Sequence, residues 1–145
     1  MSNVFAVEQL LISRIADNVP AFVEVGTVAK LSGYQFDQIP LPACYVVPGK
    51  AEVVGEPHDG GVQIERQEWQ VVICVPFIDD TTDETNTATK AAGELIYQVA
   101  QQLIGWRPAQ GFQPFAYRGR PEPYLESGYG EFPALFETGL VLAGI

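Results

Sequence analysis

The segment AAGELIYQVAQQLIG, residues 91–105, constrains the fold more than any other stretch. Its apolar residues recur three or four positions apart, as one face of an α-helix requires. That face consists of Ala92, Leu95, Ile96, Val99 and Leu103. The run Gly105-Trp106-Arg107-Pro108 follows, and a glycine just past a helix with a proline soon after it is typical of a helix end. We therefore interpret this run as a helix stop, with a binding site as the alternative.

The segment before this helix, DDTTDETNTATK at residues 79–90, concentrates acidic and hydroxyl side chains. Thr81 followed by Glu84 fits a capping box. Asp79, Asp80 and Asp83 would add negative charge near the positive end of the helix dipole. A divalent cation site is the alternative, but the spacing lacks the central glycine of a calcium loop. The sequence favours a helix start here.

The N-terminal region predicts a second amphipathic helix, from residue 2 or 3 to about residue 17. Its apolar face consists of Val4, Val7, Leu11 and Ile15. Residues 21–28 then form a short strand candidate, which Gly26 would break. Residues 31–42 contain glycine and prolines that disfavour a long regular element, so we expect a loop or short turns there.

Three further segments predict strands. The first, ACYVVPG at residues 43–49, is rich in β-branched and aromatic residues, and Pro48 and Gly49 would close it. A turn signal, EPHDGG at residues 56–61, separates it from a long strand at residues 62–77. In the first half of that strand Ile64, Arg66, Glu68 and Gln70 alternate with Glu65, Gln67 and Trp69, so both faces carry polar side chains, whereas from Val71 on both faces are apolar. This pattern predicts that the first half projects as a ribbon that carries Trp69.

The C-terminal part of the chain adds more strand. Residues 115–118 form a short candidate, and residues 131–145 form either a strand pair or one long bent strand. One face of the latter carries Phe132, Ala134, Phe136, Thr138, Leu140 and Leu142.

The order of these elements predicts an α+β fold. Two helices would pack on one face of a largely antiparallel sheet of about four to five strands, in which mixed pairing stays open, with a protruding β-hairpin. The length of 145 residues favours a single domain over residues 1–145. One sheet face would then lack a helix, and that face, together with the ribbon, could be covered in an oligomer.

Composition excludes several functional classes. A net charge of −10 disfavours sequence-independent binding of nucleic acid, which needs lysine and arginine to replace counterions. Cys44 and Cys74 lie in apolar runs and are expected to be buried free thiols in a reducing compartment, with a disulfide between neighbouring strands left open. The N-terminus has no signal-peptide pattern, and the apolar runs are too short to span a bilayer.

No motif indicates catalysis. His58 lies in a turn near Glu56 and Asp59, where a solvated turn explains it better than a metal site or an acid–base pair. A nucleophilic role for either cysteine would require this distant histidine as its base. We predict no enzyme activity and no cofactor.

Arginine and tyrosine residues at 117–129 form the one basic, aromatic patch of the sequence. These arginines would either contact another protein or pair with Glu122 and Glu126. Together with the ribbon, the patch supplies the predicted interface residues: Arg66, Glu68, Trp69, Arg118, Arg120, Tyr124 and Tyr129.

Five segments in a fixed order define the layout of the chain: MSNVFAVEQLLISRIA, LPACYVVPG, QEWQVVICV, LIGWRP and PYLESGYGEFPALFET. This layout resembles that of the tail terminator, or tail completion, proteins of long-tailed bacteriophages, particularly those of Mu-like phages. The resemblance covers nearly the whole chain.

The resemblance implies a non-enzymatic virion protein that forms a hexameric ring on the last ring of the tail tube. Such a ring stops growth of the tube and sheath and offers a surface for joining the head through the connector. Genomic DNA would pass through it without specific binding, and the protein would be made in the bacterial host cytoplasm and lie at the neck of the virion. Another neck, head-tail joining or minor tail component is one alternative, and a small ligand-binding domain or enzyme is the other.

Overall fold

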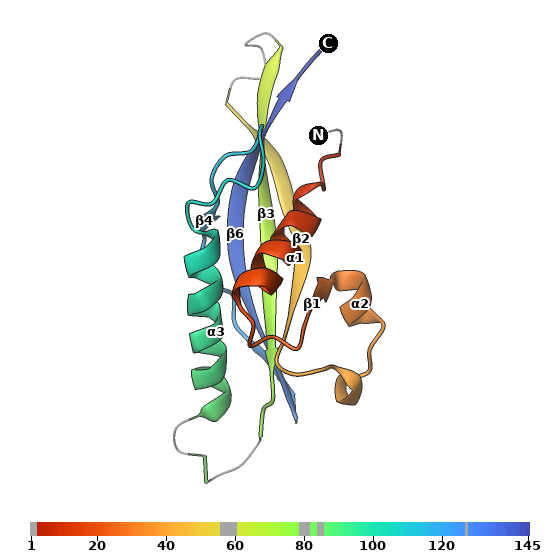
Figure 1. Ribbon diagram of the computed structural model, residues 1–145, viewed down its shortest axis with the longest axis vertical. Coiled ribbons are helices and arrows are strands. Elements are labelled where there is room, and N and C mark those ends of the chain that lie inside the picture. Colours follow the sequence, from red (N-terminus) through yellow and green to blue (C-terminus); the bar gives the residue numbers. More distant parts are fainter. Residues whose placement is uncertain (1–2, 56–60, 79–81, 84–85, 127) are drawn as a thin grey trace.

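The centre of the molecule is an open mixed sheet of six strands (Figure 1). The structure is a computed structural model, and it describes residues 3–55, 61–78, 82–83, 86–126 and 128–145. The strand order is β1-β2-β3-β6-β4, and β5 also pairs with β6. This arrangement confirms the predicted α+β class.

Three long strands dominate the sheet: β2 (Ala43–Val54), β3 (Val62–Val75) and β6 (Tyr129–Ala143). They pair antiparallel, whereas β1 (Glu24–Thr27) pairs parallel with the start of β2. The short strands β4 (Ala116–Tyr117) and β5 (Tyr124–Glu126) pair antiparallel with β6. The C-terminal segment is therefore one long strand.

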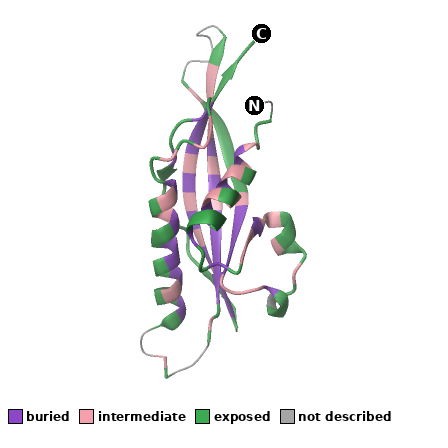
Figure 2. Ribbon diagram, in the orientation of Figure 1, coloured by how far each residue is buried: buried purple, intermediate pink, exposed green. Residues whose placement is uncertain are grey.

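The two long helices, α1 (Val7–Asn18) and α3 (Thr87–Leu103), lie on the same face of the sheet (Figure 1). Their apolar faces are buried against it, as the purple bands in Figure 2 show. All five predicted face residues of α3 are buried, and so are the last three of the four predicted in α1. The helix packing was thus predicted correctly.

The opposite sheet face is covered over part of its length by residues 28–42. These contain α2 (Val28–Ser32) and the 3-10 helix η1 (Phe36–Gln38). Here a smaller apolar cluster forms, with Ala43, Tyr45, Val72, Cys74 and Tyr129 among its members. The sequence predicted only loop or short turns in this region, because neither helix is long enough to show a period.

Two predicted strand limits are wrong. Gly26 lies within β1, and Pro48 and Gly49 do not end β2, which continues to Val54. The register shifts between Pro48 and Ala51, which marks a β-bulge. Since β1 pairs only as far as Val46, Pro48 lies on a sheet edge, where its missing N–H costs no ladder bond.

The start of α3 also differs from the prediction. Its N-cap is Asn86, whose side-chain oxygen accepts a hydrogen bond from the Thr89 N–H at 3.2 Å. The predicted cap at Thr81 is therefore wrong, because the helix begins six residues later, at Thr87. Residues 79–81 and 84–85 lie outside the described residues, as does the expected turn at 56–60.

The end of α3 agrees with the interpretation of Gly-Trp-Arg-Pro as a helix stop. Gly105 has φ of +79°, a left-handed conformation that glycine adopts without steric cost. The Trp106 N–H donates to the Leu103 carbonyl at 3.0 Å, and the indole ring stacks on Phe115 with 5.8 Å between centroids. The run therefore ties the helix end to the chain that returns towards β6.

Candidate functional site

Trp69, the centre of the predicted ribbon interface, is buried, with an exposed fraction of 1%. Odd-numbered residues of β3 face the helices, and Trp69 packs against the start of the chain, where Phe5 meets it edge to face at 6.4 Å. Its indole N–H donates to the Gln67 side-chain oxygen at 3.2 Å. The expected exposure of Trp69 is wrong, because the residues before α1 cover this part of the strand.

Gln67 extends this buried contact to the N-terminal segment. Its amide nitrogen donates to the backbone carbonyl of Val4 at 2.8 Å and to Glu65 at 2.9 Å. The amide thus satisfies its hydrogen-bonding capacity inside the molecule, as a buried polar group requires. Trp69 and Gln67 anchor the N-terminal segment of the same chain.

Tyr129 is likewise buried, on the other sheet face. Its hydroxyl donates to Glu131 and lies 3.5 Å from the Cys74 thiol. Burial, followed by these two contacts, raises the pKa of Tyr129 far above its usual range. A neutral phenol with partners in its own chain is part of the core, so the expected surface position of Tyr129 is wrong.

Arg66 and Arg118 are brought together by an acid that the sequence did not single out, Glu137 of β6. The Arg118 guanidinium binds both carboxylate oxygens of Glu137, at 3.0 and 3.2 Å. Arg66 binds the same carboxylate at 3.2 Å and Glu52 at 3.5 Å. The predicted pairing of Arg118 with Glu122 or Glu126 is therefore wrong, since β4 places Arg118 beside the middle of β6.

The remaining predicted interface residues lie at the surface but not in one patch. Glu68 is half-buried on the same sheet face as Arg66. Tyr124 is exposed in β5, where its hydroxyl donates to Glu126 at 2.5 Å. Arg120 is exposed between β4 and β5 and lines a hollow beside α3.

That hollow, the α3 groove, has a volume of about 430 Å³ and lies between one side of α3 and residues 117–123. Its lining includes Gly93, Ile96, Tyr97, Tyr117, Arg120 and Phe132. Tyr97 is a large aromatic residue, yet 67% of it is exposed. We did not predict this groove from the sequence. The only indication of it there was that Gly93 and Tyr97 lie on the polar side of the helical pattern.

A second hollow of about 370 Å³ lies over the upper part of β6 and includes Arg66, Gln113 and Glu137 in its lining. It adjoins the narrow end of the sheet, where β2, β3 and β6 extend beyond the helices (Figure 1). We call residues 51–54, 62–66 and 139–143 the ribbon end. It corresponds to the projecting first half of β3 that the sequence predicted.

Glu24 forms a polar cluster that the sequence did not indicate. Its carboxylate accepts hydrogen bonds from the Tyr45 hydroxyl at 2.8 Å and the Tyr34 hydroxyl at 3.0 Å, and pairs with Lys30 at 3.0 Å. Burial alone would raise the pKa of Glu24, but the bonds from Tyr45, Lys30 and Tyr34 outweigh it and hold the pKa below its usual range. The cluster fastens α2 and the following turn to β1 and β2.

No group of three or more His, Cys, Asp or Glu residues in the described part of the chain gathers in a way that could hold a metal ion. His58 with Glu56 and Asp59, and the acids at 79, 80 and 84, lie outside the described residues. In the described residues no helix is both long and apolar enough to cross a bilayer.

The two thiols are buried and free. Cys44 belongs to the cluster under the helices and Cys74 to the cluster on the opposite face, so their side chains point to different sides of the sheet. Burial raises the pKa of Cys74 to about 12 and that of Cys44 further still. A buried thiol with a raised pKa is a poor nucleophile and acts as a small hydrophobe.

Comparison with known proteins identifies a family for this chain. A family model described as phage tail terminator protein matches residues 1–144. A search of curated proteins finds no match.

Among solved structures, one described as "Virion of native gene transfer agent (GTA) particle" contains a chain with a similar fold. The TM-score is 0.50 and the sequence identity is 15%. That similarity covers 94% of this chain and 98% of the other. A second structure has a TM-score of 0.43 and 16% identity over 93% of this chain and 90% of its own, which is too distant to add weight. Because the family model spans nearly the whole sequence, the chain belongs to the phage tail terminator protein family and is a structural protein of a phage tail.

Proposed function

We propose that six copies of this chain form a ring that caps the end of the tail tube. The ring stops polymerisation of the tube and, in a contractile tail, of the sheath, and it offers the surface to which the head connector binds. The family match over residues 1–144 carries this proposal. We treat residues 1–145 as one domain that needs no cofactor.

The ribbon end supports assembly with other protein surfaces. Its exposed apolar side chains lie on both faces of the three strands: Val53, Val62, Val141 and Leu142. Apolar side chains that project from a sheet on both faces have no partner within their own chain, and such patches commonly mark contact sites. A ring would cover them, whereas an isolated monomer leaves them in water.

The acidity of the chain is compatible with passage of DNA through the ring. Its net charge is −10, and a lumen of negative charge repels phosphates instead of holding them. In this proposal the DNA passes through without specific contacts. The protein is made in the host cytoplasm and ends in the neck region of the virion.

Mass measurement in solution combined with electron microscopy of tail tubes tests the proposal. The chain has a mass of 15.8 kDa, so the expected ring has six times that mass and lies at the head-proximal end of each tube. A chain that remains a strict monomer, alone and with tubes, would overturn the terminator role. A ring found elsewhere in the particle would instead favour another neck or minor tail component.

A further inference from the structure

We propose that the α3 groove of one copy receives the ribbon end of a second copy. This inference rests on the proposed ring and names the two surfaces that form its repeated contact. The groove is concave and largely apolar, and the ribbon end is a projection with exposed apolar side chains. The two patches are complementary in shape and in chemistry.

Gly93 is the first observation that indicates an occupant from outside the chain. It lies in the interior of α3, where glycine destabilises a helix relative to alanine. A Cβ atom built at Gly93 meets no other atom within 4 Å, so no contact in this chain requires a glycine there. The missing side chain instead deepens the groove, which lets another chain approach the helix backbone closely.

Tyr97 and Arg120 are the second observation. Tyr97 stands one turn after Gly93 with most of its ring in water, between the α3 groove and an adjoining hollow. Arg120 is the one charged side chain in the groove lining, and in the described part of the chain no acid lies within ion-pairing distance of it. Tyrosine and arginine, together with tryptophan, are enriched among the residues that contribute most of the binding energy of protein interfaces.

The ribbon end matches these features. Val53, which is 53% exposed, and Leu142 provide apolar side chains on the same face as Glu65. Glu65 has no cation as a partner in the described structure and accepts a hydrogen bond only from Gln67. A neighbouring copy therefore offers a carboxylate to Arg120 together with apolar side chains for the groove.

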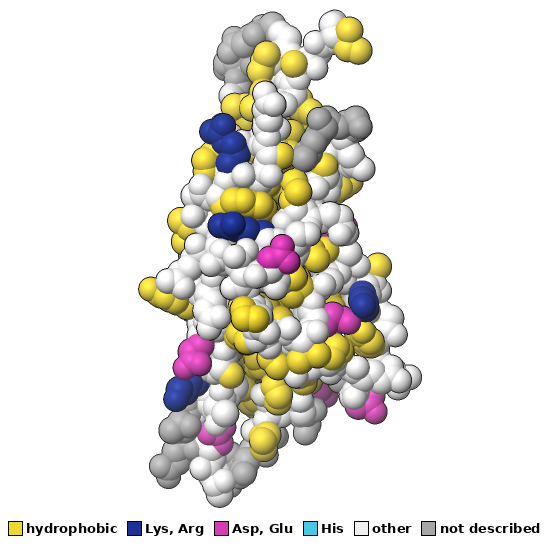
Figure 3. Space-filling view, viewed as in Figure 1, with side chains coloured by type: hydrophobic (Ala, Val, Ile, Leu, Met, Phe, Trp, Pro, Cys, Tyr) yellow, Lys and Arg dark blue, Asp and Glu magenta, His cyan; other side chains and the backbone are white. Residues whose placement is uncertain are grey.

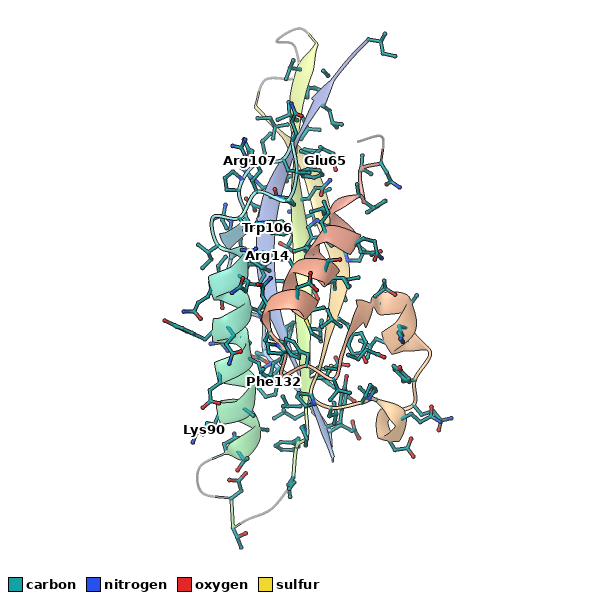
Figure 4. All side chains as sticks on the ribbon, in the orientation of Figure 1. Arg14, Glu65, Lys90, Trp106, Arg107 and Phe132 are labelled. Atoms are coloured by element: carbon teal, nitrogen blue, oxygen red, sulfur yellow. The ribbon has the colours of Figure 1, made fainter. Side chains whose placement is uncertain are left out.

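The two surfaces lie in different parts of the molecule. Figure 4 places Phe132, which lines the groove, beside the lower half of the sheet and Glu65 at the upper end. In Figure 3 the ribbon end projects above the body of the molecule. One copy can therefore use both surfaces at once, and a contact between two different surfaces repeats head to tail until a ring closes.

Two variants block one surface each. Gly93→Trp fills the groove, and Val53→Lys with Leu142→Lys places charge on the ribbon end. We expect each variant to raise the concentration needed for ring assembly about tenfold or more, because each removes the centre of the contact. Gln101→Trp on an exposed part of α3 outside the groove, and Val23→Lys on an exposed position away from the ribbon, are the matched controls and should assemble normally.

Unfolding in urea shows whether each variant is folded before its assembly is scored. If Gly93→Trp is unstable, Gly93→Gln replaces it. Where rings form only on tail tubes, the same variants are scored by occupancy of tube ends.

Mixing the two blocked variants tests directly whether the groove of one copy binds the ribbon end of another. The Gly93→Trp copy keeps its ribbon end and the double-lysine copy keeps its groove, so a mixture retains one working contact. At a concentration where the wild type forms rings but neither variant does, we expect dimers in the mixture, no larger rings, and only monomers of either variant alone. Absence of dimers in the mixture, or rings from Gly93→Trp at the same concentration as the wild type, would overturn this contact and leave the ring itself intact. A wild-type chain that never forms rings would overturn the proposed function instead.

Discussion

Trp69 shows how the face of a strand decides what a side chain does. It lies on β3 between Glu68 and Gln70, and the polar residues on both faces of this half of the strand suggested an exposed ribbon. In the structure the N-terminal segment before α1 covers that face, through Phe5 and the bond from Gln67 to the Val4 carbonyl. Trp69 is therefore a residue of the core.

Replacing Trp69 by alanine should strongly destabilise the monomer. The substitution leaves a cavity and removes the donor to Gln67, and large-to-small changes of this kind cost about 3–5 kcal/mol. Urea unfolding followed by circular dichroism measures the loss. Trp69→Phe keeps most of the ring volume and should cost clearly less, so equal midpoints for all three proteins would contradict the buried position.

Glu24 should make stability depend on pH. Its pKa is lowered in the folded chain from the usual 4.5, so its contribution is present above that value and is lost as pH falls through the lowered folded pKa. The Glu24→Gln variant keeps acceptors for Tyr34 and Tyr45 but cannot pair with Lys30. We expect it to be less stable than the wild type near neutral pH.

That difference between wild type and Glu24→Gln should shrink as the pH falls below 4.5 and through the lowered folded pKa of Glu24, since the wild-type carboxyl then becomes neutral as well. Urea unfolding of both proteins at neutral and at acidic pH measures it. A difference that stays constant across this window would show that the carboxylate charge does not stabilise the fold.

The helix α3 is limited at each end by one residue in a left-handed conformation. Asn86 has φ of +47° at the start, and Gly105 has φ of +79° at the end. Both residues are compatible with this conformation, asparagine because its side chain bonds locally and glycine because it lacks a Cβ. The helix is thus defined by local chemistry as well as by its buried face.

Asn86→Ala should destabilise the chain by about 0.5–2 kcal/mol, because it removes the cap to Thr89 and places a Cβ-bearing residue without that cap in the left-handed region. Asn86→Gly should cost only a few tenths of a kcal/mol, since glycine adopts that conformation freely. Thermal unfolding of the three proteins compares these losses. If Asn86→Gly proved as unstable as Asn86→Ala, the side-chain cap and not the backbone conformation would be decisive.

The sheet gives the molecule two unlike sides and a projecting end. α1 and α3 cover one face, while α2 and η1 cover only part of the other, so the ribbon end extends beyond both layers (Figure 2). The Arg66, Glu137 and Arg118 network lies on the less covered face. These charges are mutually paired within the chain.

Much of this architecture can be predicted from the sequence alone, because residues buried on one face of a helix or strand recur at a regular spacing along the chain. The apolar face of α3, the Gly105 stop, the long strands and the α+β class are visible from spacing, since a helix repeats every 3.6 residues and a strand every two. Buried Cys44 and Cys74 were expected for the same reason. The family resemblance was also apparent from the order of these elements.

Other features depended on contacts between residues far apart in the chain. Three features depend on which segments come together when the chain folds. They are the contact of Trp69 with the N-terminal segment, the acid that binds Arg118, and the way Glu24 holds α2. A strand pattern shows which residues share a face, but it does not show what covers that face. The groove beside Gly93 likewise arises because residues 117–123 lie beside α3. This is a contact between segments far apart in the sequence, so the spacing of apolar residues within either segment does not predict it.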